Sequence, residues 1–395
     1  MKKRKGIVLV ASINAFHGNV LPDSFEKIHT EELGLSVLEN SGLKMTINCH
    51  QLDLLMYPWL GKYQNSNNLK FSGGLFSHVL PALTSVEHLE WQEENGIINP
   101  TVSFYPEFCS PKKPTRNFWL LDSQTHYYSS CGSSEEVVWN AEEVGALPST
   151  IKVNGQFGFV MKERLFKPIL DLMFLSQRFP DAKNAEGVSN LDHLVQAIAD
   201  LEEVVLVPFD LEAPYVGSML GKNFWERLIE KIKENNLEDR FLDFEEVHQS
   251  LIEDATTLSD TPHRNLGKWT SVEATYDYFA DLKVYSKRKL SEKEHLLLAF
   301  AASADPAAAI FQKSLYSRKP INLTLVDLFG NNASVKITGN SEIIKVGYIA
   351  RGVFLTKMKK EEGAEALKLW RELSKKQKCG IFWKQLISVT KQLDI

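Results

Sequence analysis

The sequence lacks the features that mark disulfide-rich, nucleic-acid-binding or membrane-spanning proteins. Its 395 residues include only four cysteines, and none has the CxxC spacing of a zinc site or disulfide framework. The net charge of -5 gives no polyanion-binding signature, so nucleic acid is not an expected partner. No apolar stretch is long enough to span a membrane, and no membrane association is expected.

The N-terminal segment also lacks a complete signal peptide. Residues 2–5 are basic and residues 6–11 are apolar, as in the first two regions of such a peptide. The apolar run is too short, however, and Asn14 and His17 follow it in place of a small-residue cleavage site. We therefore expect a buried first strand here, reduced thiols and a cytoplasmic protein.

Hydrophobic residues make up 44% of the chain and charged residues 24%, which is typical of a soluble globular protein. Apolar runs predict buried parallel strands at residues 7–11, 43–47, 101–105, 119–121, 157–161 and 204–209. Apolar residues at helical spacing predict helices at residues 25–40, 77–95, 163–178, 190–201 and 223–235. This alternation of strands and helices indicates a β/α barrel or a doubly wound sheet.

The chain changes character near residues 254–265, a polar stretch that we interpret as a long loop leaving the barrel. Beyond it we expect helices at residues 272–284, 292–304 and 306–317, a β-rich patch at 321–328 and 334–354, and amphipathic helices within 361–393. The expected domains are a catalytic barrel over 1–255, a helical segment over 256–318 and a C-terminal β/α extension over 319–395.

Two predicted strands end in carboxylates that are candidates for acid and base chemistry. Glu107 follows the apolar residues 101–105, and Asp210 with Glu212 follows residues 204–209. The carboxyl ends of barrel strands form the active-site mouth, and alternation along an extended chain places Asp210 and Glu212 on the same side. Close carboxylates raise one another's pKa, which can keep one of them protonated near neutral pH. An ordinary strand-end or helix-entry acidic residue is the alternative interpretation.

Further candidates for substrate contact lie near other predicted strand ends or are aromatic. His17 and Asn19 follow the first strand, while Gly74 and His78 lie in a glycine pair and the turn after it. No GK[ST] or GxGxxG motif follows that glycine pair, so nucleotide binding is not expected. Sugar rings stack on aromatic side chains, for which Tyr215 and Trp269 are candidates, although most such residues belong to the core.

In this order, His17, Tyr105-Pro-Glu107 and Asp210-Leu-Glu-Ala-Pro-Tyr-Val-Gly217 resemble the motifs of the family 57 glycoside hydrolases. The resemblance implies a (β/α)7-type barrel followed by a helical domain that contributes to the substrate groove. That domain would include the segment around Trp269 and the helix that leads to Asp305. It also implies a retaining α-glucan-processing enzyme with Glu107 as nucleophile and Asp210 as general acid/base. His17-Gly-Asn19 departs from the family's usual His-Gln-Pro.

By this resemblance the partner is an oligosaccharide or polysaccharide, no cofactor is needed, and the oligomeric state is open. Water as acceptor would give hydrolysis, and a sugar hydroxyl would give transglycosylation or branching. One alternative is a deacetylase-like or mannosidase-like hydrolase with zinc held by His17, His78 and Asp210, although few ligands stand at short spacing. The other alternative is an inactive barrel that binds glycan.

Overall fold

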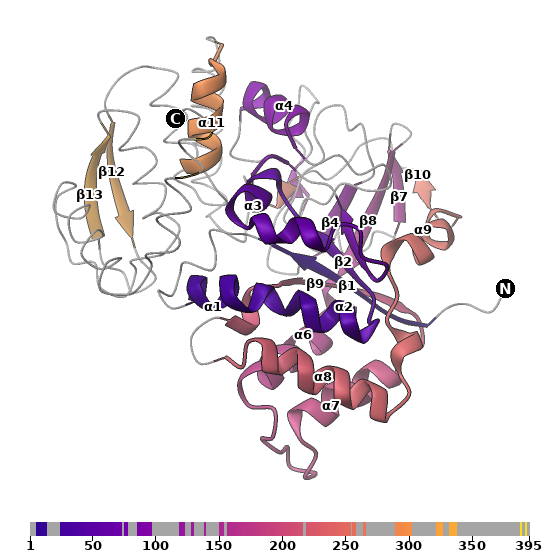
Figure 1. Ribbon diagram of the computed structural model, residues 1–395. Coiled ribbons are helices and arrows are strands. Elements are labelled where there is room, and N and C mark those ends of the chain that lie inside the picture. The colour runs from indigo at the N-terminus through magenta and orange to yellow at the C-terminus, as the bar shows by residue number, and fades with distance from the viewer. Residues whose placement is uncertain are drawn as a thin grey trace.

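The computed structural model describes a large part of the chain, mostly before residue 254. The described residues are 5–13, 24–72, 75–77, 85–96, 118–122, 128–129, 138–139, 150–153, 156–215, 219–253, 255–257, 264–265, 289–301, 321–326, 332–337, 388 and 392. The predicted strand 101–105 and the predicted helices 272–284 and 306–317 lie outside them. Within them, strands and helices alternate, and the α/β class is confirmed (Figure 1).

The first sheet has four parallel strands in the order β3 (Leu69–Ser72), β2 (Met45–Asn48), β1 (Gly6–Ser12) and β9 (Val204–Asp210). Three of them match predicted apolar runs, and β3 was not predicted. All seven residues of β1 are buried, because this strand is flanked on both edges and covered on both faces. The sheet is therefore the centre of the hydrophobic core.

Helices α1 (Ser24–Glu31) and α2 (Leu35–Ser41) replace the single helix predicted over residues 25–40. A 3₁₀ turn, η2 (Glu32–Gly34), separates them, with Leu33 at φ 55° and Gly34 at φ 71°. A Cβ at Gly34 would come within 2.6 Å of Trp225 Cδ1, so this backbone approach requires glycine. The prediction of one continuous helix was wrong because α2 turns to pack against α8 (Lys222–Glu234).

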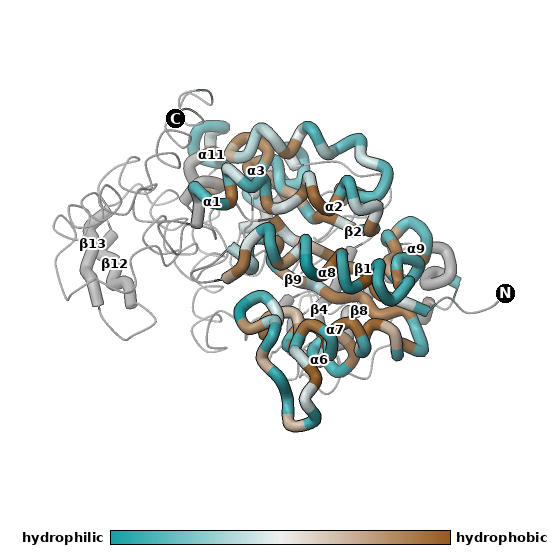
Figure 2. The backbone as a smooth tube through the Cα atoms, turned by 60° about the horizontal axis from the view of Figure 1, so that its bottom comes forward, coloured by the Kyte–Doolittle hydropathy of each residue, from teal (hydrophilic) through white to brown (hydrophobic). Residues whose placement is uncertain are grey.

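Three predicted helices are confirmed as α6 (Glu163–Arg178), α7 (Asn190–Ala199) and α8. Ser189 caps α7, and its hydroxyl accepts a hydrogen bond from the backbone N–H of Asp192 at 3.1 Å. In α8, apolar residues recur at helical spacing, with Trp225, Leu228 and Ile232 buried. Figure 2 shows the hydrophobic colour gathered along the strands and the helix faces turned toward them.

A second sheet has the order β10 (Thr256–Thr257), β7 (Thr150–Val153), β8 (Gln156–Lys162) and β4 (Phe118–Asp122). β4 runs parallel to β8, as its apolar run predicts, whereas β7 pairs antiparallel with β8. β8 lies beside β9, which brings the two sheets together. Closure into a seven-stranded barrel depends on strands outside the described residues and stays a prediction.

The interpretation of residues 254–265 as a loop leaving the barrel was wrong at two places. β10 pairs with β7, and β11 (Arg264–Asn265) pairs with β5 (Tyr128–Ser129), which pairs with β6 (Val138–Trp139). Backbone pairing thus places residues 256–257 and 264–265 in the sheets. Composition alone could not reveal it, because two-residue strands carry no periodic signal.

Short helices complete the first part of the chain. They are α3 (Gln51–Met56), η3 (Pro58–Lys62), η5 (Ala213–Tyr215), η6 (Glu238–Arg240) and α9 (Phe244–Glu253). Farther along the chain, β12 (Ile321–Val326) and β13 (Asn332–Ile337) form an antiparallel pair, as the β-rich patch predicts (Figure 1). Among the described helices, none combines the length and apolarity needed to cross a bilayer.

Helices α4 (Val86–Glu94) and α11 (Glu292–Ala301) lie side by side, although about two hundred residues separate them. The helix predicted from residue 77 was wrong at its start: α4 begins only after Ser85, whose hydroxyl accepts from the backbone N–H of His88. Between the helices, His88 Nδ1 lies 2.9 Å from His295 Nδ1, and Trp91 Nε1 donates to Glu292 Oε2 at 2.8 Å. These two contacts join α11 to α4.

Candidate active site

Four polar side chains lie in a row where the strands of the first sheet end. Ser72 pairs in register with Asn48, Asn48 with Ser12, and Ser12 with Asp210. We call these four residues the polar row. Register partners in a parallel sheet point to the same face, so the row presents two hydroxyls, an amide and a carboxylate together. Ser12, Asn48 and Ser72 are buried, whereas Asp210 is exposed.

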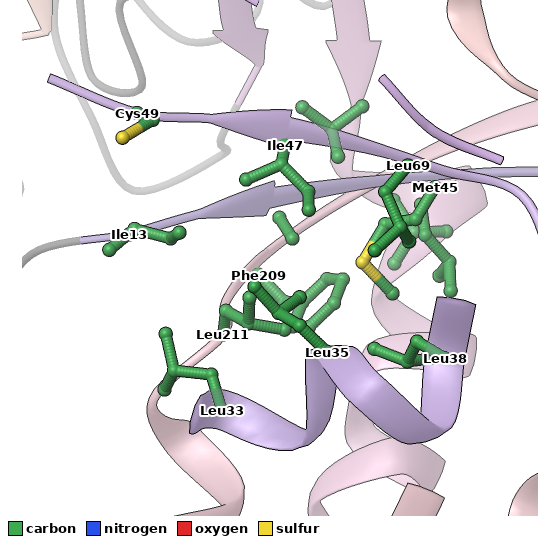
Figure 3. Close-up of a cluster of buried hydrophobic side chains, with 14 of the residues drawn as sticks. Ile13, Leu33, Leu35, Leu38, Met45, Ile47, Cys49, Leu69, Phe209 and Leu211 are labelled. Carbon is green, nitrogen blue, oxygen red and sulfur yellow. The ribbon is translucent and has the colours of Figure 1, made fainter. Parts of the chain in front are cut away.

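The polar row lies on the face of the sheet turned away from α1 and α2. Figure 3 shows Ile13, Ile47 and Phe209 pointing from the strands toward the helical turns that carry Leu33 and Leu35. Because side chains alternate between faces, the residues adjacent to Ile47, Ile13 and Phe209 in the row point to the other side. Each strand therefore packs one face against helices and offers its last polar residue to the opposite face.

Backbone hydrogen bonds hold this edge of the sheet beyond the row itself. The N–H of Ile13 donates to the carbonyl of Asn48 at 2.9 Å, and the N–H of Leu211 donates to the carbonyl of Ser12 at 2.9 Å. The Ser72 hydroxyl donates to the carbonyl of Ile47 at 3.3 Å. The strand ends are thereby fixed relative to one another, as a binding site built on strands requires.

Two buried carboxylates follow the strands of the row: Asp53 lies at the start of α3, and Glu212 follows β9. Asp53 Oδ2 accepts from the backbone N–H of His50 at 2.9 Å and lies 3.0 Å from His50 Nδ1. Burial, and then the charges of Glu212 and Asp53, hold the pKa of Tyr57 well above its ordinary value. Burial and the same two carboxylates also raise the pKa of the Cys49 thiol. Both groups therefore stay protonated, and Cys49 is no nucleophile.

Asp210 and Glu212 occupy different surroundings, although the sequence predicts a shared site. Asp210 is the exposed end of β9, whereas Glu212 is 1% exposed and lies close enough to Tyr57 and Cys49 to act on their pKa values. Two carboxylates in unlike environments can take unlike protonation roles. The roles predicted for them, acid/base for Asp210 and substrate contact for Glu212, stay predictions.

Tyr215 is placed among the helices, away from the polar row. It is 1% exposed, and its hydroxyl lies 2.9 Å from the position that a Cβ of Gly34 would take. Lys27 Nζ lies 5.8 Å from the ring centroid. Burial, followed by the charges of Glu31 and Glu226, raises the pKa of Tyr215. These contacts bury the ring among the helices, and the substrate contact expected of Tyr215 stays a prediction.

The other predicted site residues lie outside the described part of the chain. These are Glu107, His17, Asn19, Gly74, His78, Trp269 and Asp305. The distance between the carboxyl groups of Glu107 and Asp210, expected at about 5 to 5.5 Å for a retaining enzyme, therefore stays a prediction. Among the residues that the structure does describe, no group of three or more His, Cys, Asp or Glu side chains could hold a metal ion.

Sequence reasoning missed Asn48, Ser72 and the His50–Asp53 pair. The signal for Asn48 was present, because it directly follows the predicted apolar strand 43–47 in the same way that Glu107 follows 101–105. Asn19, after the first strand, is the asparagine that the family resemblance singles out, and no such resemblance covers Asn48. Ser72 gave a weaker signal, since Leu69–Ser72 is too short and too mixed to be predicted as a strand.

Comparison with known proteins gives likenesses of structure alone. No family model matches the sequence, and no curated protein matches it. The chain is similar to a GH57 branching enzyme from Thermococcus kodakaraensis, with 9% identity, 88% of this chain and 89% of that one covered, and a TM-score of 0.47. It is also similar to a GH57-type branching enzyme from Pyrococcus horikoshii, with 10% identity, 80% and 86% covered, and a TM-score of 0.48.

A third similar structure is the α-amylase AmyC from Thermotoga maritima. Its identity is 10%, 79% of this chain and 87% of that one are covered, and the TM-score is 0.46. Likenesses of this size carry no conclusion about activity, which has to come from the residues of this chain.

Proposed function

We propose that this chain is a retaining α-glucan-processing enzyme, a divergent member of the family 57 glycoside hydrolases. Asp210 is its general acid/base and Glu107 its nucleophile. The observation that carries the proposal is the polar row: an exposed carboxylate ends a buried strand, in register with Ser12, Asn48 and Ser72 on the same face of the sheet. Hydroxyl and amide groups beside a carboxylate match the chemistry of a sugar substrate.

The proposed reaction is a double displacement. Asp210 protonates the glycosidic oxygen while Glu107 attacks the anomeric carbon, and the bond between that carbon and the leaving sugar breaks as the glycosyl-enzyme forms. Asp210 then removes a proton from the acceptor, which attacks the anomeric carbon and releases Glu107. Water as acceptor completes hydrolysis, and a hydroxyl group of a second glucan completes a transfer.

Position within the fold also supports Asp210 in this role. Its exposure leaves the carboxylate able to meet a substrate and to exchange protons with water. The backbone around it is fixed, since Leu211 bonds to Ser12 and the whole of β9 pairs in register with β1. A rigid strand with an exposed reactive tip is the arrangement expected of an active-site residue in an α/β protein.

The test compares Asp210→Ala on two substrates of unlike leaving group. Maltohexaose needs a proton on its leaving oxygen, so we expect its turnover to fall by about 10² to 10⁴-fold. An aryl α-maltoside with an acidic phenol leaves without that proton, so its first step should fall far less. Glu203→Gln, at the opposite end of β9 and exposed, is the matched control and should change neither rate.

Glu107→Gln tests the second role. We expect it to lower turnover of both substrates alike, by at least about 10³-fold, because nucleophilic attack is needed whatever the leaving group. Equal losses on both substrates for Asp210→Ala would contradict the acid role. Unchanged turnover in Asp210→Ala and Glu107→Gln would contradict the whole proposal.

A further inference from the structure

We infer that Asn48 is a substrate-binding residue whose amide forms two hydrogen bonds with hydroxyl groups of the sugar ring bound beside Asp210. The inference rests on the proposed function and adds to it a residue of the site. Asn48 is not among the residues predicted from the sequence, and the evidence for it comes from its burial, its register in the sheet and the missing hydrogen bonds of its amide.

The amide of Asn48 is buried without being satisfied. Asn48 is 0% exposed, and within the described part of the chain neither Nδ2 nor Oδ1 has a hydrogen-bond partner. An amide removed from water without partners is unfavourable, because it gives up its hydrogen bonds to water and gains none. A ligand that offers an acceptor to Nδ2 and a donor to Oδ1 would supply the two missing hydrogen bonds.

The position of Asn48 in the row indicates which group that is. Asn48 lies between Ser72 and Ser12, and only β1 separates it from β9. Neighbouring strands are about 4.8 Å apart, so Asn48 and Asp210 are separated by roughly 10 Å between backbones. This separation matches the width of a sugar ring, so a sugar with its glycosidic oxygen at Asp210 reaches Asn48 once the chain that covers Asn48, Ser12 and Ser72 moves aside to admit it.

The chemistry of an amide matches that of a sugar ring. Nδ2 offers hydrogen-bond donors and Oδ1 offers an acceptor, side by side in one plane. Neighbouring hydroxyl groups of a pyranose can accept from the one and donate to the other. The hydroxyls of Ser12 and Ser72 flank the amide; that of Ser72 donates to the carbonyl of Ile47 and can still accept, and that of Ser12 can donate or accept.

Asn48 has two unpartnered atoms, whereas other buried polar side chains have one. Ser176, Gln177, Tyr215 and Trp225 each have one such atom, and none of them belongs to the row. One unpaired hydroxyl or N–H is a small local defect that a water molecule can satisfy. Asn48 has a donor and an acceptor unpaired together at a strand end, which is the pattern of a binding group.

The experiment measures ligand affinity and stability in the same variants. In the Asp210→Asn protein, for which slow turnover is expected, the dissociation constant of maltohexaose is measured by calorimetry with and without Asn48→Leu. We expect Asn48→Leu to weaken binding by about tenfold or more, since two hydrogen bonds are lost. The thermal midpoint of the free protein should stay the same or rise by about 1 to 4 °C, because an unsatisfied amide has been removed.

Ser176→Ala is the matched control. It also removes a buried, unpartnered polar atom, but from α6 and outside the row. We expect it to leave the dissociation constant of maltohexaose unchanged. Asn48→Asp is the second variant: it keeps the shape and the acceptor but loses the donors, and we expect it also to weaken binding. If the leucine side chain disturbs the sheet, Asn48→Asp still tests whether the amide donors bind the sugar.

Three results would overturn the inference. Equal affinity in Asn48→Leu and its parent would show that the amide does not contact the sugar, while leaving the proposed function intact. A fall of several degrees in the midpoint of the free Asn48→Leu protein, with unchanged affinity in Asn48→Asp, would show that the amide is satisfied by the chain or by water. Absence of maltohexaose binding in the parent, together with no turnover in the wild-type protein, would overturn both the inference and the proposed function.

Discussion

The polar row at the end of the first sheet and the polar contacts between α4 and α11 both bury hydrogen-bonding side chains, but they treat them differently. In the row, Asn48 keeps an amide without a partner among the described residues. Between the helices, His88, Gln92 and Ser77 pair with one another and with His295. We call these last four residues the histidine cluster. One group is incomplete without a ligand, and the other is complete within the chain.

The hydrogen bonds of the histidine cluster fix the position of each proton. Gln92 Nε2 donates to His88 Nε2 at 3.1 Å, so His88 carries its proton on Nδ1 and donates it to His295 Nδ1 at 2.9 Å. Gln92 Oε1 accepts from the backbone N–H of Ser77 at 2.8 Å. Burial, and then the neighbouring His295 ring, hold the pKa of His88 well below its ordinary value, so the ring stays neutral.

Stacking completes the histidine cluster. The rings of His88 and His295 each lie parallel to Trp91, with centroids 5.6 Å and 5.3 Å away. A polar network in which every member is paired stabilises one arrangement, whereas an unpaired buried group lowers stability until something binds to it. The comparison therefore separates residues paired within the fold from residues proposed to serve the reaction, and each change below acts either on the polar row or on the contacts between α4 and α11.

The largest effect expected is on activity, from Asp210→Asn in the polar row. Turnover of maltohexaose should fall by about 10² to 10⁴-fold, because the amide cannot transfer the proton. The free energy of unfolding should change by no more than about 0.5 kcal/mol, because the side chain is exposed. Denaturant unfolding and initial rates, measured on the same samples, check both. A large loss of stability would mean that Asp210 belongs to the fold.

The opposite pattern is expected for His88→Ala in the histidine cluster. Loss of a fully buried ring and of its two hydrogen bonds should lower the free energy of unfolding by about 2 to 4 kcal/mol. Glu90→Ala, an exposed position on the same helix, is the control and should have little effect. Urea unfolding measures both, and equal stabilities would contradict the structural role of the cluster.

His88 also predicts how stability depends on pH. Its pKa is lowered in the folded protein, so below about pH 6.5 the unfolded chain takes up a proton that the folded chain does not. The free energy of unfolding should therefore fall as the pH falls below that value, by up to about 1.4 kcal/mol per pH unit for this group. Above it, the contribution is fully present.

His88→Gln removes the titrating ring and should lessen this loss of stability between about pH 6.5 and about pH 5.5. His29 and His295, whose pKa values burial also lowers, remain in both proteins, so the difference between the two slopes reports the removal of the His88 ring. Urea unfolding of the wild-type and His88→Gln proteins at these pH values checks the prediction. Identical slopes would show that His88 has the same pKa in the folded and unfolded protein, and would contradict the prediction.

The smallest effect is expected from Trp91→Phe. The stacking partner is largely kept, but the hydrogen bond from Nε1 to Glu292 Oε2 is lost, which should lower the free energy of unfolding by about 1 kcal/mol. Glu292→Gln keeps an acceptor and should cost less. Thermal unfolding measures the stability of both variants. A larger loss of stability in Glu292→Gln than in Trp91→Phe would show that the stabilising contact lies elsewhere in the interface of α4 and α11.

Much of the fold could be predicted from hydrophobic periodicity. β1, β9, α6 and α8 are strongly periodic or wholly apolar, and their positions were predicted within a few residues. The break between α1 and α2 could not be predicted, because it depends on the approach of Gly34 to Trp225, a contact between segments distant in sequence. Strands such as β10 exist only through pairing with β7 and leave no pattern of their own.

Less of the candidate site could be predicted. Asp210 was found because a carboxylate after an apolar strand stands out. Asn48 was missed because an asparagine in that place is ordinary until its burial and missing partners are known. Tyr215 was expected at the substrate because of its position after Asp210; its burial beside Gly34 could not be predicted, because it depends on the turn at η5, and its substrate contact stays a prediction.

The stereochemistry of the first product tests the central claim most directly. Wild-type protein is mixed with maltohexaose, and proton magnetic resonance follows the anomeric signals before mutarotation. A double displacement through Glu107 and Asp210 predicts that the first-formed sugar, or the first new glycosidic bond, has the α configuration of the substrate. A first product of β configuration would mean a single displacement with two differently spaced carboxylates, and would contradict the account.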